Sequence, residues 1–162
     1  MESLHVEIVM TTKNWLKGMV AGFVATVVLS ALMLMKQQMG MMPELNPIQM
    51  VTSMLGASSP ATGWLMHFLI GTVLWGTLFA WLDPYIPGGA HWLKGAWFSI
   101  GAWLMMMIIV MPMAGKELFG IDLGIMAPVM TLVMHVIYGI VLGATYGLER
   151  PEQTSGYQEA RR

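Results

Sequence analysis

The sequence predicts an all-α membrane protein: a four-transmembrane-helix bundle built from two repeated helical hairpins, with both termini cytoplasmic. Three observations lead to this prediction. Hydrophobic residues make up 56% of the 162 residues and charged residues only 10%, whereas a soluble domain carries about 25% charged residues. The charges separate four long uncharged stretches, and motifs of the first half of the chain recur in the second half.

Each uncharged stretch is long enough to cross a lipid bilayer. We expect the spans at about 15–37, 61–82, 94–115 and 123–148, which together form one transmembrane domain, 15–148. A helix needs about 20 apolar residues to cross ~30 Å of hydrocarbon. Pro128 lies in the first turns of the last span, where a missing N–H costs least. The short alternating segments of a transmembrane β-barrel are absent from the sequence.

The connections between the spans differ in content. About 25 residues separate Lys36 from Pro60, and within them 47–55 is predicted to form a short helix, with Asn46 as its N-cap and Pro47 at its first position. The segment 83–89 contains two prolines and two glycines and predicts a rigid turn. We expect Asp83 to organise this turn, and His91 beyond it to be solvated.

The Lys and Arg residues predict the orientation of the chain. One side of the membrane would carry Lys13, Lys17, Lys94, Arg150, Arg161 and Arg162, and the other side only Lys36 and Lys116. By the positive-inside rule, 1–14 is then a cytoplasmic N-terminal segment and 149–162 a cytoplasmic polar tail. The first residues are acidic, unlike a signal peptide, so we expect the first span to be retained.

An internal repeat relates the two halves. The motif Trp-Leu-Lys-Gly at 15–18 recurs 77 residues later at 92–95, and Met-His-x3-Gly at 66–71 recurs 68 residues later at 134–139. Each half contains two helices, so both halves enter the membrane from the same side, as in parallel repeats about an axis along the membrane normal.

Glycines mark the predicted helix contacts. Gly139, Gly143 and Gly147 recur every fourth residue and form one groove along the last span, and Gly71 occupies a matching place in the second span. In lipid, helices associate through close backbone approach over such small residues. We therefore interpret these four glycines as helix-packing positions.

His67 and His135 are the candidate cofactor ligands. They lie inside the spans, 16 residues before Asp83 and 14 before Glu149, and therefore at nearly equal depth. An ionisable group within the membrane usually faces the bundle interior and is a functional candidate. The two imidazoles are compatible with haem b ligation between the second and fourth spans, with a metal site, or with a proton or quinone path. The structural alternative is a pair of neutral histidines hydrogen-bonded across helices, with Thr131 and Tyr138 as available partners.

The 19 methionines raise the possibility of copper, because thioether and imidazole both suit that metal. Pairs spaced i,i+4 occur, such as Met107 with Met111 and Met130 with Met134. However, methionines surround the helices instead of following one stripe, which favours their use as flexible apolar filler. Copper is therefore a weaker alternative than haem b.

Other kinds of site are excluded or disfavoured. The chain contains no cysteine, so disulfides, Cys-ligated zinc, iron–sulfur clusters and thiol catalysis are excluded. It has no basic stripe for nucleic acid. No phosphate loop, nucleophile elbow, catalytic carboxylate pair or HExxH motif occurs, so we name no catalytic residue and favour a non-enzymatic role.

Two motifs carry a resemblance to a known family. They are Gly-Trp-Leu-Met-His-Phe-x2-Gly at 63–71 and Met-Ala-Pro-x6-His-x2-Tyr-Gly at 126–139, together with Trp-Leu-Lys-Gly at 92–95. Over roughly 15–148 the chain resembles a bacterial family of small four-span membrane proteins of unknown function. The resemblance implies four spans and the bacterial inner (cytoplasmic) membrane, and it supplies no activity.

These observations favour a small inner-membrane protein that acts as a non-catalytic accessory or structural subunit of a larger membrane complex, respiratory or oxygenase in type. Its expected contacts are the lipid bilayer and other membrane-protein subunits, or a second copy of itself. The alternatives are a small b-type cytochrome with bis-histidine ligation by His67 and His135, or a membrane protein that binds copper through His and Met.

Overall fold

The computed structural model describes residues 2–148, with side chains from residue 14 onward, and every regular element in this part of the chain is helical. The elements are α1 (Glu2–Gln38), α2 (Pro47–Met54), α3 (Pro60–Leu69), η1 (Ile70–Trp75), α4 (Gly76–Leu82), α5 (His91–Met105), η2 (Met106–Val110), α6 (Met111–Met113), η3 (Leu118–Leu123) and α7 (Met126–Leu148). The predicted polar tail, 149–162, lies outside the described residues.

Within the described part of the chain, four helical segments are long and apolar enough to cross a membrane: Asn14–Gln38, Pro60–Leu82, His91–Met113 and Met126–Leu148. The predicted class, all-α with four such helices, is confirmed. The short helix between the first two spans is also confirmed as α2, which begins at Pro47 after the Asn46 side chain accepts a hydrogen bond from the Gln49 backbone N–H.

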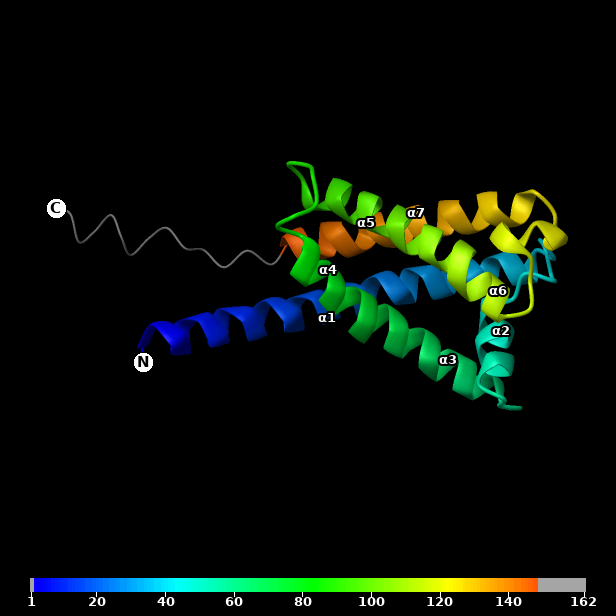
Figure 1. Ribbon diagram of the computed structural model, residues 1–162, viewed down its shortest axis with the longest axis horizontal. Helices are drawn as coiled ribbons and strands as arrows, with labels where there is room; N and C mark the ends of the chain where they lie inside the picture. The colour runs from blue at the N-terminus through cyan, green and yellow to red at the C-terminus, as the bar shows by residue number, and fades with distance from the viewer. Residues whose placement is uncertain (1, 149–162) are drawn as a thin grey trace.

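The helices α1 and α7 form the centre of the bundle. α7 packs along α5 and along α1, and α1 also packs against η1 and α4. α3 departs from this centre, and in Figure 1 it runs away from α5 and α7 toward α2, against which it packs. The bundle has two ends. The α2 end carries α2, α6 and η3, and the Asp83 end carries the turn between α4 and α5.

Glycines allow the central helices to touch backbone to backbone. A Cβ added to Gly95 or Gly139 would collide with the carbonyl oxygen of the other residue, and Gly18 and Gly76 are related in the same way. Such contacts let the backbones of α5 and α7, and of α1 and α4, approach each other closely. At Gly139 any side chain would therefore collide with the backbone of α5.

Two of the spans contain a widened π-helical turn, η1 in the second and η2 in the third. η2 is followed by Pro112, which lacks an N–H and whose ring conflicts with the carbonyl four residues earlier, so it disturbs the α-helical ladder at that point. η1 contains no proline, and its Gly71 carbonyl accepts a hydrogen bond from outside its own helix. π-helical turns inside α-helices frequently accompany functional sites.

Candidate functional site

His67 lies on α3 and reaches toward α1. Its Nε2 is 3.1 Å from the Ser30 hydroxyl oxygen, and that hydroxyl is also 2.7 Å from the Thr26 carbonyl oxygen. A serine hydroxyl has one hydrogen, so when it is donated to the Thr26 carbonyl, His67 Nε2–H is the donor to Ser30. The His67 ring also packs edge-on against Trp64 and Phe68 of its own helix.

His135 is bonded within its own helix. Its Nδ1 lies 2.7 Å from the Thr131 carbonyl oxygen, so Nδ1 carries the hydrogen and donates it. In a neutral imidazole this fixes the lone pair on Nε2. The sequence suggested Thr131 as a partner of His135, and the group that accepts this hydrogen bond is the Thr131 backbone carbonyl. The Thr131 hydroxyl accepts a different hydrogen bond, from the Trp103 indole N–H of α5 at 3.1 Å.

The hydrogen bonds formed by residues 14–148 give the two imidazoles separate partners and do not join them. Their helices also pack differently, since α3 lies mainly against α2, whereas α7 lies against α5 and α1. The bond that does cross between the second and fourth spans is made by the buried Tyr138 hydroxyl, which donates to the Gly71 carbonyl at 2.7 Å.

Gly71 and Tyr138 meet beside a polar position of α1. A Cβ on Gly71 would collide with the Thr26 hydroxyl, so this glycine allows α1 and η1 to come together. Thr26 and Ser30 are both buried and hydrogen-bond to carbonyls one turn earlier. Sequence reasoning missed both residues, although Gly22, Thr26 and Ser30 recur every fourth residue and define one small, polar face of the first span.

Metal-ligand geometry is limited in the described residues. Residues 14–148 contain no group of three or more His, Asp or Glu side chains placed to hold a metal ion. The i,i+4 pair Met107 and Met111 is fully buried in an apolar cluster with Leu45 and Ala127. These two thioethers fill the core in the way that the scatter of methionines suggested.

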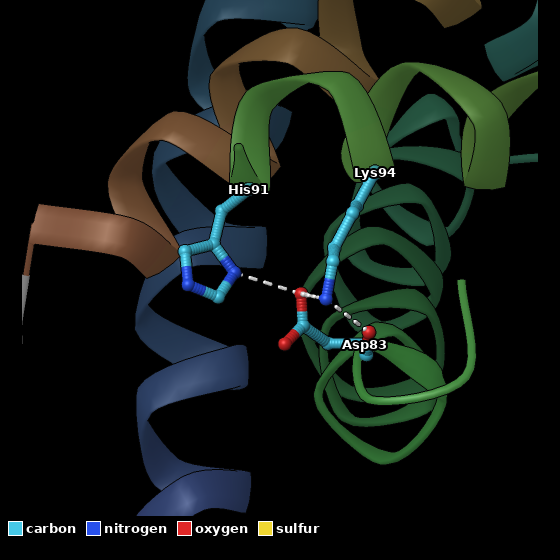
Figure 2. Close-up of polar contacts among 3 residues, drawn as sticks. All are labelled: Asp83, His91 and Lys94. Atoms are coloured by element: carbon cyan, nitrogen blue, oxygen red, sulfur yellow. Dashed lines mark hydrogen bonds and ion pairs between the residues drawn. The ribbon is translucent and has the colours of Figure 1, made fainter. Parts of the chain in front are cut away.

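A second polar cluster ties α4 to α5 at the Asp83 end (Figure 2). The Asp83 carboxylate accepts a hydrogen bond from His91 Nδ1 at 2.8 Å, and Lys94 Nζ lies 3.7 Å from the same oxygen. Lys94 Nζ also donates to the Asp83 carbonyl at 2.7 Å. The expectation that His91 is solvated is wrong: its side chain is 24% exposed, and its ring packs edge-on against Tyr146 of α7.

The signal for this cluster was present in the sequence. Asp83, His91 and Lys94 flank a turn whose prolines and glycines bring its ends together, so opposite charges on the two sides of that turn are placed to meet. Lys17 completes this end of the bundle, with its Nζ 5.0 Å from the centre of the Tyr146 ring, a cation–π distance.

A third polar feature is a pocket at the α2 end. It has a volume of about 460 Å³ and lies between the last turns of α1, part of α2 and the start of α3. Lys36 lines it, although only 8% of this residue is exposed, and its Nζ donates to the carbonyls of Met42 at 3.0 Å and Leu45 at 2.5 Å. Sequence reasoning used Lys36 only for topology and missed this burial.

Comparisons with known proteins give one match. A family model described as a family of unknown function (DUF6789) matches residues 12–156. No curated protein and no solved structure matches the chain. The match agrees with the expectation of a family without an assigned function, and it names no ligand or partner.

Proposed function

The chain belongs to the DUF6789 family, and we propose that it is a non-catalytic accessory subunit that packs against a transmembrane helix of a larger membrane complex, respiratory or oxygenase in type. We further propose a bacterial inner-membrane location with both termini cytoplasmic, which the distribution of Lys and Arg supports. The duplicated hairpins belong to the same proposal and are supported by the glycine-mediated helix crossing in each half of the chain.

The observation that carries this proposal is an apolar groove of about 490 Å³ between the second and third spans. Its walls come from η1 and α4 on one side and α5 on the other, with Trp75 and Trp97 among the lining residues. Gly101 forms part of the groove, and a Cβ added there would meet no atom within 4 Å. An open glycine in an apolar groove between spans is the kind of surface on which another membrane helix packs.

A larger side chain at position 101 would fill the open part of the groove and should weaken partner binding. We expect the native protein, purified in a mild detergent, to carry other membrane chains in fixed stoichiometry, and Gly101→Leu to lower their recovery about tenfold, which corresponds to about 1.4 kcal/mol. Quantitative mass spectrometry of the co-purifying chains measures this. Ala144→Leu is the matched control, because Ala144 is an exposed small residue of α7 outside the groove. Equal recovery with both variants, or a stable solitary protein, would contradict the proposal.

A small b-type cytochrome is the second candidate, and the tautomer of His135 favours it. Because Nδ1–H is donated to the Thr131 carbonyl, Nε2 holds a lone pair, which is the form in which histidine ligates metals with a backbone carbonyl as outer support. His67 would be the other axial ligand, once its ring hydrogen moves from Nε2 to Nδ1 and Nε2 exchanges the Ser30 hydroxyl for iron.

Absorption spectroscopy tests this candidate directly. Protein produced with ample haem is expected to show a Soret band and a reduced-minus-oxidised difference spectrum if His67 and His135 bind haem b. His67→Ala and His135→Ala should each abolish or shift these bands, whereas His91→Ala should leave them unchanged, because His91 is bonded to Asp83. Haem-free protein, or a spectrum that is the same in all three variants, would rule out haem b ligation by His67 and His135.

A further inference from the structure

Lys36 is a buried cation that forms no ion pair with another side chain of residues 14–148, and the Glu44 carboxylate attracts it only from beyond ion-pair distance. None of the ion pairs formed among these residues includes it, and its Nζ is bonded only to two backbone carbonyls. An ammonium group has three N–H donors, so one remains. Removal of a charge from water is costly unless an opposite charge or further hydrogen bonds compensate it. An anion next to Lys36 would supply that compensation.

The pocket beside Lys36 offers hydrogen-bond donors and no acidic side chain. Lys36 is the only charged residue in its lining, and Gln37 and Gln49, whose side chains carry amide N–H donors, are lining residues as well. Thr52 and Ser53 donate their hydroxyl hydrogens to carbonyls of their own helix, so they add little donor capacity. One cation and several amide N–H groups together suit an oxyanion such as a phosphate group.

Apart from Asn46 and Ser58, the rest of the lining is apolar, and part of it belongs to the membrane spans. Met33 and Leu34 of α1 and Trp64 of α3 form this part of the pocket. Tryptophan is enriched where the lipid chains give way to the headgroups. α2 closes the pocket and is amphipathic in pattern, with Ile48 and Thr52 buried against α3 and Gln49 and Ser53 exposed. Short helices of this kind lie in the plane of the membrane interface.

We propose that the pocket at the α2 end binds a phospholipid through its phosphate group. Lys36 and the amides of Gln37 and Gln49 hold the phosphate oxygens, and the start of the acyl region lies over Met33, Leu34 and Trp64. A lipid is favoured over free phosphate because the pocket combines a polar wall with an apolar wall at the ends of two spans. A volume of about 460 Å³ suits a headgroup with its glycerol and not a whole lipid.

Lipid titration of the purified protein tests this site. Native mass spectrometry in a mild detergent counts the molecules bound when phosphatidylglycerol, diacylglycerol with the same acyl chains, or inorganic phosphate is added. We expect one phosphatidylglycerol to bind, and diacylglycerol to bind about tenfold more weakly or worse, because a hydrogen bond to a charged group is lost with the phosphate. Lys36→Met should reduce phosphatidylglycerol binding to the level of diacylglycerol.

Two further variants make the result specific. Lys116→Met is the matched control, since Lys116 pairs with Asp122 at 3.4 Å and does not line the pocket, so its binding should be unchanged. Ser53→Trp fills the pocket from exposed α2 while the carbonyl bonds of Lys36 remain, and it should reduce binding even if Lys36→Met does not fold. Binding that is unchanged in Ser53→Trp and Lys36→Met would overturn the proposal, as would equal affinity for diacylglycerol. Equal affinity for inorganic phosphate would overturn its lipid part.

Discussion

Gly139→Ala is expected to destabilise the helix bundle by about 3 kcal/mol, at the upper end of the cost of overpacking a tight core. A methyl group at this position would collide with the Gly95 carbonyl oxygen and with the Ser99 side chain. Backbone atoms cannot move aside without separating α5 from α7, which is the most extensive helix contact of the fold. The measurement is the free energy of unfolding in mixed micelles, followed by circular dichroism as the denaturing detergent is increased.

The three glycines of α7 should differ from one another. Gly143→Ala meets the backbone of His91 and Trp92 and should cost as much as Gly139→Ala. Gly147→Ala meets only the His91 side chain, at 3.2 Å or more, so it should cost less than about 1 kcal/mol, since a side chain can shift. Gly101→Ala is the open-space control and should be neutral or slightly stabilising, because alanine favours the helix. Equal costs at all four positions would contradict this account of the packing.

The sequence predicted the four helices and led to the proposal of a glycine groove, because both rest on local patterns. Long uncharged stretches determine spans regardless of what surrounds them, and Gly139 and Gly143 are spaced to share one face of a helix. The N-cap and proline of α2 are likewise local signals, carried by Asn46 and Pro47. The divergence of α3 from α5 and α7 has no such signal, since a helix that is apolar on every face gives little indication of its rotation or tilt.

The candidate site was less predictable for the same reason. Equal depth made His67 and His135 a candidate ligand pair, but depth leaves the direction of each side chain open. Their hydrogen-bond partners, Ser30 and the Thr131 carbonyl, come from different helices. The hydrogen bond between the second and fourth spans is donated by the Tyr138 hydroxyl to the Gly71 carbonyl. The burial of Lys36 was equally unpredictable from the sequence, because it results from the fold of the loop that follows α1. In this loop Gly40 and Met42 have positive φ.

Asp83→Ala is expected to cost about 2 kcal/mol of stability, the usual effect of removing a partner from a buried hydrogen bond to a charged group. The carboxylate is only 10% exposed and accepts the His91 N–H at 2.8 Å (Figure 2). α5 begins at His91 without a side-chain cap, so the Asp83 carboxylate also compensates the positive end of that helix. Lys94 keeps its bond to the residue 83 backbone carbonyl in the variant, which limits the loss.

Two comparisons separate this buried cluster from an ordinary surface ion pair. Asp83→Asn keeps an oxygen that accepts the His91 N–H, so it should recover about half of the loss. Lys116→Ala removes only the ion pair with Asp122, because Asp122 keeps its hydrogen bond from the Glu117 backbone N–H. The Lys116 and Asp122 side chains are 35% and 31% exposed, so this variant should cost less than about 0.5 kcal/mol. A double-mutant cycle of Asp83→Ala with His91→Ala should give a coupling of about 1 kcal/mol or more, since the residues are in contact. Zero coupling, or equal losses for Asp83→Ala and Lys116→Ala, would mean that the buried Asp83–His91 bond adds no more stability than a surface ion pair.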